Sequence, residues 1–368
     1  METEALSVTH WFETEPDGQP YAATIRFTGR RNGVRGKAGP RDAFVKEETV
    51  DGVVPGSGRV SITTWVYGLQ PGEWTVTADL IRLASSADGR RPFSGGKPSG
   101  AHTLPRAAWS WRRWGLSTDQ FAPVKTRWSP LVRLTRTPAV IRGSWPGLIA
   151  VGVLVGAAVQ AALLTRANVP VGLSLMVDLL ALVAGLLLAK LWYLALRPRR
   201  SWRQSIGEGW TVDGLLFAAP AVGAAALIAF NLPVGQFLDA SAPALFFGVA
   251  IGRLGCFFTG CCAGRCTRSR WGVWSSDRRV GARRIPTQLL ESATGLLIGI
   301  VSLLLVLRLP SAPGAVFVAA VAAYVLIRQF LLRLRAEPHN PIRARLTAAA
   351  AAVVLLADAV LLLLPSSS

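Results

Sequence analysis

Seven apolar stretches in the second part of the chain constrain its fold more than any other feature. Each has close to the roughly 20 residues that a helix needs to cross a lipid bilayer. The stretches run over residues 146–165, 171–196, 213–232, 240–260, 287–308, 313–334 and 345–364. Only 17% of the residues are charged, whereas about 25% is usual for soluble proteins. The sequence therefore predicts an all-α polytopic membrane bundle of about seven transmembrane helices.

The residues before these stretches have a polar and alternating pattern. Short runs of alternating apolar and polar residues, separated by turns, lie between about Val8 and Leu83. This spacing is typical of a small antiparallel sandwich. We expect a small all-β sandwich-like domain over residues 1–84. A basic linker rich in Trp, Pro and Gly then rests on lipid headgroups over 85–144, and the membrane domain covers 145–368.

The loops between the apolar stretches alternate in charge. Arginines gather before the first stretch and in loops 2–3, 4–5 and 6–7, whereas loops 1–2 and 5–6 carry a single arginine each and loop 3–4 carries none. By the positive-inside rule, the arginine-rich loops and the N-terminal domain face the cytoplasm. The first residues lack a basic segment followed by an apolar one, so we expect no cleavable signal peptide. Membrane topology and anionic lipid account for the net charge of +19, and no nucleic-acid partner is expected.

One segment carries the candidate chemistry. Arg253 ends an otherwise apolar stretch, where an arginine is costly unless an anion pairs with it. Arg284 precedes the fifth stretch, and Gln288 and Glu291 share one face of its first turns. Two arginines and a carboxylate at one membrane boundary can bind a lipid phosphate and polarise a leaving group. The alternatives are that Arg253 extends to lipid headgroups and that Glu291 caps its helix and pairs with Arg284.

Glycines accompany these charged residues. They occur at Gly248, Gly252, Gly255, Gly260 and Gly264. A glycine lets backbone approach closely, and a turn of this kind can receive an anion. We therefore expect Gly255 and Gly264 to contribute to a headgroup site with the two arginines.

Two motifs at this place resemble the prolipoprotein diacylglyceryl transferase family. The family pattern reads approximately D-x-x-A-P-A-x-x-x-G-x-x-x-G-R-x-G-N-F-x-x-G-E-x-x-G, and then R-H-P-[ST]-Q-L-Y-E. The chain matches it at Asp239, Ala242, Pro243, Ala244, Gly248, Gly252, Arg253, Gly255, Phe257, Gly260 and Gly264, and at Arg284, Pro286, Thr287, Gln288, Leu289 and Glu291. The resemblance covers about residues 145–335. It implies transfer of a diacylglyceryl group from phosphatidylglycerol to a lipoprotein cysteine, without a cofactor.

The chain departs from the family pattern at several positions. Cys256, Cys261, Ile285 and Leu290 stand where the family has Asn, Glu, His and Tyr. The family's H-G-G-L-I-G element would fall near residues 212–217, where this chain has no histidine. Asp213 is the candidate base at that place. The predicted catalytic residues are therefore Glu291, Gln288 and Asp213.

Four cysteines lie close together in the chain, at Cys256, Cys261, Cys262 and Cys266. Their spacing lacks the paired C-x2-C pattern of zinc sites, so we predict no metal. A disulfide is sterically conceivable but disfavoured at a cytoplasmic face. Two interpretations stay open, which are apolar packing in a helix and turn, and a thiolate at Cys256 or Cys261. Such a thiolate, with a pKa lowered by neighbouring arginines, would act as nucleophile or lipid carrier.

The sequence thus favours a diacylglyceryl transferase in the cell membrane, with phosphatidylglycerol and a lipoprotein precursor as partners. One alternative is a non-catalytic phospholipid-binding scaffold derived from the same family. A transporter is the other alternative, although no stretch carries a clear charge pair at mid-membrane. The family resemblance implies an acceptor outside the cell, whereas the loop charges place loop 4–5 in the cytoplasm.

Overall fold

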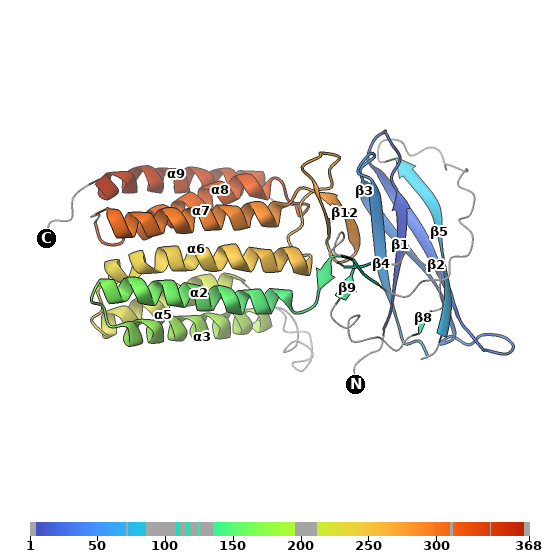
Figure 1. The fold of residues 1–368 in the computed structure, drawn as a ribbon, viewed down its shortest axis with the longest axis horizontal. Coiled ribbons are helices and arrows are strands. Elements are labelled where there is room, and N and C mark those ends of the chain that lie inside the picture. Colours follow the sequence, from blue (N-terminus) through green and yellow to red (C-terminus); the bar gives the residue numbers. More distant parts are fainter. Residues whose placement is uncertain are drawn as a thin grey trace. The chain divides into compact units, whose positions relative to one another are not determined.

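The computed structural model describes most of the chain, and Figure 1 shows the order of its elements. The described residues are 5–70, 73–85, 108–110, 115–117, 124–125, 135–195, 212–309, 312–338 and 340–363. The chain forms two compact units, which we describe separately. The sheet unit comprises Met1–Ile149, Ile251–Ser292 and Phe330–Asn340, and the helical unit comprises Ala150–Ala250, Ala293–Gln329 and Pro341–Ser368. Most of the predicted linker lies outside the described residues, so its boundaries stay predictions.

Seven helices form the membrane domain in the described part of the chain. They are α2 (Ser144–Arg166), α3 (Val171–Ala195), α5 (Val212–Ala229), α6 (Val234–Thr259), α7 (Thr287–Arg308), α8 (Ala315–Leu332) and α9 (Pro341–Leu363). Five of these, namely α2, α3, α6, α7 and α8, are long and apolar enough to cross a membrane. The prediction of a polytopic helical bundle preceded by a small β-domain is confirmed.

Helix α6 begins six residues before the predicted fourth stretch, at Val234. The sequence pattern had placed residues 234–239 in the loop before this stretch. The structure shows why the charge of Asp239 is tolerated inside the helix. Its carboxylate accepts hydrogen bonds from the backbone N–H groups of Gly314 (2.8 Å) and Phe317 (3.1 Å). These are N–H groups at the start of α8 that have no partner within their own helix, so Asp239 caps α8 from a neighbouring helix.

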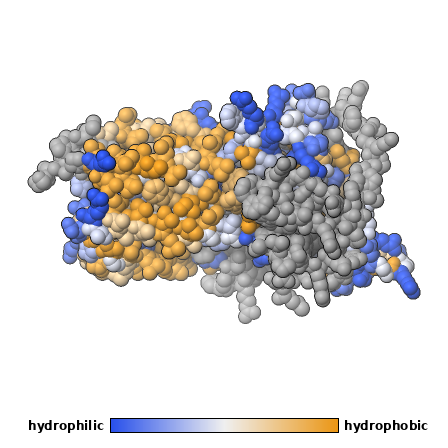
Figure 2. All heavy atoms as spheres, viewed as in Figure 1, coloured by the Kyte–Doolittle hydropathy of each residue, from blue (hydrophilic) through white to orange (hydrophobic). Residues whose placement is uncertain are grey.

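The helices expose apolar side chains over their outer surface. Figure 2 shows hydrophobic residues gathered over the helical region. Leu154, Leu187 and Leu297 are each at least 60% exposed. An apolar surface of this extent fits lipid rather than water. Within the helical unit, α2 and α6 approach closely, because a side chain at Gly152 would lie only 3.0 Å from the carbonyl oxygen of Gly248. Small residues permit this kind of close packing between membrane helices.

The strands form two four-stranded sheets and two short pairs. Sheet one has the order β1-β4-β12-β11 and sheet two the order β3-β2-β5-β8. Their strands are β1 (Ala5–Glu13), β2 (Tyr21–Arg31), β3 (Ala43–Val53), β4 (Arg59–Tyr67), β5 (Glu73–Ser85), β8 (Val124–Lys125), β11 (Val273–Ser276) and β12 (Val280–Arg284). The short pairs are β6 (Ala108–Ser110) with β7 (Gly115–Ser117), and β9 (Thr135–Thr137) with β10 (Val140–Ile141).

A single apolar core joins the two larger sheets. Sheet two contributes Phe27 and Trp74, and sheet one contributes Val8, Ile62 and Val280. Along β2 the buried residues alternate with more exposed ones, as expected for a strand with one face toward a core. The alternation of apolar and polar residues that predicted a sandwich-like arrangement thus corresponds to buried and exposed positions along β2.

One sheet of this sandwich is completed by a hairpin from far along the sequence. Strands β11 and β12 lie between α6 and α7, and β12 pairs antiparallel with β4 through Val280 opposite Ile62 and Gly281 opposite Ser61. The indole N–H of Trp274 also donates to the carbonyl oxygen of Arg59 (2.9 Å). The sequence analysis did not predict these strands. Because they share a sheet, the N-terminal β-domain and the loop between α6 and α7 lie on the same side of the membrane.

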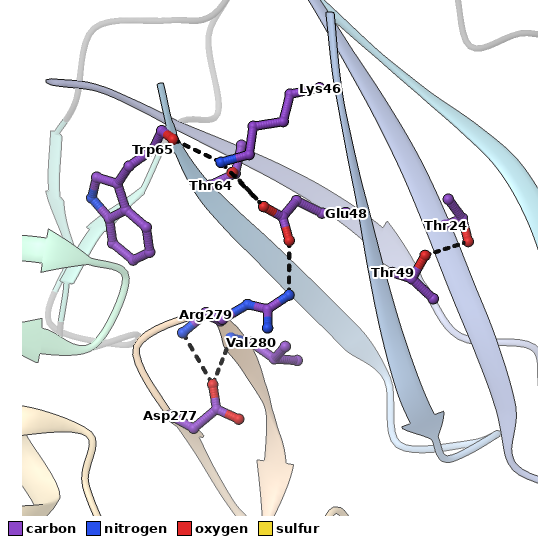
Figure 3. A network of polar contacts seen from close by, with 9 residues as sticks. All are labelled: Thr24, Lys46, Glu48, Thr49, Thr64, Trp65, Asp277, Arg279 and Val280. Atoms are coloured by element: carbon purple, nitrogen blue, oxygen red, sulfur yellow. Dashed lines mark hydrogen bonds and ion pairs between the residues drawn. The ribbon is translucent and has the colours of Figure 1, made fainter. Parts of the chain in front are cut away.

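A polar network fixes the turn of this hairpin, as Figure 3 shows. The Asp277 carboxylate accepts from the backbone N–H groups of Arg279 (3.0 Å) and Val280 (2.7 Å). The Arg279 guanidinium donates to Glu48 on β3 (2.8 Å), and the Thr64 hydroxyl donates to the other oxygen of Glu48 (2.8 Å). Burial acts to raise the pKa of Glu48, but the Thr64 hydrogen bond and the Arg279 charge outweigh it, so the pKa lies below its usual value.

Candidate functional site

A buried carboxylate paired with two arginines is the central feature of the site. Glu291 lies one turn into α7 and is 1% exposed. Its Oε2 atom lies 2.8 Å from Nε of Arg253 on α6, and its Oε1 atom accepts a hydrogen bond from Nη2 of Arg335 at 2.5 Å. All three residues belong to the sheet unit. Two guanidinium groups face one carboxylate, so the cluster keeps a net positive charge, which suits it to stabilise an anion.

Backbone contacts hold Arg335 at the end of α8. Arg335 pairs with Gly264 in an isolated β-bridge, and Nε of Arg265 donates to the Arg335 carbonyl oxygen (3.1 Å). The sequence analysis did not single out Arg335. The sequence offered no signal for it, because it is one of several arginines in loop 6–7 and only the fold shows which of them turns inward.

Gln288 and Thr287 hold the segment that follows α6. The Gln288 side-chain amide donates to the Cys261 carbonyl oxygen (2.9 Å), and the Thr287 hydroxyl donates to the Cys262 carbonyl oxygen (3.2 Å). Gln288 is 2% exposed and Thr287 is fully buried. The structure thus brings together the predicted residues Arg253, Gln288 and Glu291 around the start of α7.

Arg284 has different partners. It is 4% exposed, and its guanidinium donates to Asp277 (2.7 Å) and to the carbonyl oxygens of Gly264 (3.1 Å) and Val280 (3.3 Å). From the sequence, Arg284 and Arg253 were expected to share one headgroup pocket. In the structure each of them pairs with its own carboxylate.

The two predicted headgroup glycines lie at close backbone approaches. A side chain at Gly264 would collide with the Ile285 carbonyl oxygen, and one at Gly255 would lie 3.1 Å from the Trp145 Cα atom. Gly264 therefore permits the segment after α6 to pack against the segment before α7, and Gly255 permits α6 to pack against the start of α2. Their contribution to a headgroup site stays a prediction.

Asp213, the predicted base, belongs to α5, and its side chain lies outside what the structure describes. The only histidine near loop 6–7, His339, also lies outside the described residues.

The four cysteines are free thiols in the structure. Hydrogen bonds from the thiols of Cys256 and Cys261 lower the pKa of Cys262 below the usual thiol value, and the charges of Arg335 and Arg253 add to this effect. Burial raises the pKa of Cys266. Among the described residues, no group of three or more His, Cys, Asp or Glu side chains is arranged to hold a metal ion.

Apolar helices with a buried, positively charged ion cluster at the beginning of α7 define a multi-pass membrane protein with a polar site at a helix boundary. The sequence pattern of prolipoprotein diacylglyceryl transferase matches residues 141–364. The chain belongs to the prolipoprotein diacylglyceryl transferase family. The match starts just before α2 and leaves the N-terminal β-domain outside it. A comparison with curated proteins gave no match.

Proposed function

We propose that this protein transfers a diacylglyceryl group from phosphatidylglycerol to the cysteine thiol of a lipoprotein precursor. The observation that carries the proposal is the buried Arg253–Glu291–Arg335 cluster within the residues that match the family. The acceptor sulfur attacks the carbon of the diacylglyceryl group that is bonded to the phosphate oxygen, and a carbon–sulfur bond forms. The carbon–oxygen bond breaks, glycerol phosphate leaves with the electron pair, and the thiol proton passes to a base.

Each residue of the cluster has a distinct part in this proposal. Arg253, with 15% of its side chain exposed, stabilises the negative charge that grows on the leaving phosphate. Glu291 holds Arg253 and Arg335 in place, and is a positioning residue. Gln288 fixes the backbone at Cys261 and so shapes the wall of the site. Asp213 is the proposed base.

Replacing Arg253 with Lys tests this proposal. Lysine keeps a charge that pairs with Glu291 but loses the fork that matches phosphate geometry. We expect diacylglyceryl transfer to a synthetic lipoprotein peptide to fall about 100-fold, with the thermal unfolding midpoint nearly unchanged. Peptide mass spectrometry measures the product, and Arg268→Lys in the exposed loop is the matched control. If the unaltered protein binds phosphatidylglycerol but forms no product, the non-catalytic lipid-binding scaffold replaces the transferase.

We also propose that the N-terminal β-domain and the site face the cytoplasm, so the acceptor cysteine would reach the site from that side, whereas the family resemblance implies an acceptor outside the cell. The loop charges support this orientation, and the pairing of β4 with β12 requires that both lie on one side. Membrane-impermeant maleimide should leave Cys262 unlabelled in intact cells and label it after permeabilisation, since its lowered pKa favours the reactive thiolate. In a variant with all four cysteines replaced by Ser, Asn231→Cys between α5 and α6 should label from outside. Labelling of Cys262 in intact cells would instead establish the opposite orientation.

A further inference from the structure

One pocket in the sheet unit is lined by arginines and by no carboxylate among the described residues. It has a volume of about 360 Å³ and lies where α2 begins and α6 ends. Arg142 and Arg278 contribute positive charge to its lining, and Trp145 and Pro146 contribute apolar surface. No Asp or Glu lines it among the described residues. Two positive charges without a carboxylate at the ends of apolar helices favour an anion that also has an apolar part.

The arginines of this pocket differ from the other arginines of the site in their partners. Arg253 and Arg335 are paired with Glu291, and Arg284 is paired with Asp277. Within the part of the chain that the structure describes, neither Arg142 nor Arg278 pairs with a carboxylate. Both are exposed to solvent, so both are accessible to a ligand. The start of α2 adds the positive end of a helix dipole to the same place.

Arg278 adopts a backbone conformation that its residue type disfavours. Its φ angle is +83°, in the left-handed region that glycine and asparagine occupy most easily. It lies in the turn between β11 and β12, which Asp277 and the contact of Arg279 with Glu48 hold fixed. Its Nε atom donates to the Thr259 carbonyl oxygen at 3.1 Å, at the C-terminal end of α6. Glycine would adopt this φ angle with less strain. The strained backbone at Arg278 therefore points to a role for its side chain.

We propose that this pocket binds the phosphodiester of an anionic phospholipid, with the guanidinium groups of Arg142 and Arg278 on the phosphate and the glyceryl part against Trp145. This inference rests on the proposed function, because it assigns the site that holds the headgroup of the donor lipid before transfer, whereas Arg253 acts on the phosphate as it leaves. It moves that site away from Arg284, whose Nη1 and Nη2 atoms already donate to protein oxygens and whose Nε atom is buried. Cys261 lines the same pocket, and its carbonyl oxygen accepts from Gln288. The pocket is therefore connected to the Glu291 cluster through one short segment.

The test measures binding by the full-length protein in detergent, without an acceptor peptide. Titration calorimetry uses short-chain phosphatidylglycerol, short-chain phosphatidylcholine and inorganic phosphate as separate probes. The variants are Arg278→Gly and Arg142→Gln, with Arg268→Gln as the control. Removing one charged hydrogen-bond donor should weaken phosphatidylglycerol binding about tenfold or more. Glycine suits the φ angle of position 278, so Arg278→Gly should unfold at the same temperature as the unaltered protein or at a higher one.

The outcomes separate this inference from the proposed function. Loss of phosphatidylglycerol binding in both variants, with normal binding in the control, supports the pocket even if the protein transfers no lipid. Unchanged binding in Arg278→Gly overturns it, whether or not transfer occurs. Inorganic phosphate that binds as tightly as the lipid also overturns it, because the pocket would then be a site for free anions.

Discussion

Replacing Glu291 with Gln is expected to destabilise the protein by about 3 to 5 kcal/mol, the usual effect of breaking a buried ion pair from one side. Glu291 is 1% exposed and its two oxygens face Arg253 and Arg335. Without the carboxylate, the guanidinium groups of the buried Arg335 and the largely buried Arg253 have no opposite charge beside them. Thermal unfolding in detergent micelles measures the effect, and diacylglyceryl transfer should be lost with it.

Two further variants show whether the effect comes from the buried charges. Glu337→Gln, on an exposed position just past Arg335, should change the stability by less than about 0.5 kcal/mol. In the double variant with Arg335→Met, the loss should be smaller than the sum of the single losses, because one unpaired charge has been removed with its partner. Additive losses would show that Glu291 does not stabilise the protein through these arginines.

The sequence predicted the helices because their signals are local. Helix α7 occupies Thr287–Arg308, the range of the fifth predicted stretch, since an apolar run after Pro286 leaves little choice of start. The hairpin of β11 and β12 was not predicted for the opposite reason. Its strands have four and five residues, and such a hairpin is marginal alone. Its pairing with β4, more than 200 positions earlier in the chain, supplies the contacts that it lacks alone.

The sequence predicted which charged residues lie near the membrane boundary, but it predicted only some of the ion pairs between them. Membrane boundaries placed Arg253, Arg284 and Glu291 at the same level, and the structure pairs the first with the third. The hydropathy pattern gives the level of a residue along the membrane normal, but it does not give the direction of its side chain. Asp277 was therefore overlooked as the partner of Arg284, because it lies in the turn of the hairpin that the sequence did not reveal.

Replacing Arg284 with Met is expected to lower the stability by about 3 kcal/mol, while the folded protein binds phosphatidylglycerol with an unchanged Kd. Methionine keeps much of the volume of the side chain but removes the hydrogen bonds to Asp277, Gly264 and Val280. Chemical unfolding gives the stability, and calorimetry at a temperature where the variant is folded gives the Kd. Arg270→Met, on an exposed position of the same loop, is the control.

The Arg284→Met variant distinguishes two roles that the sequence left open for Arg284, which are binding the lipid phosphate and holding the hairpin. If Arg284 held the lipid phosphate, Arg284→Met would weaken binding about tenfold or more and leave the stability nearly unchanged. If it holds the hairpin, Asp277→Asn should remove part of the same stability, and the double variant should lose less than the sum of the two. The second result is expected, because Nη1 and Nη2 of Arg284 already donate to protein oxygens and its Nε atom is buried. Arg284 would then stabilise the hairpin and take no part in binding the lipid.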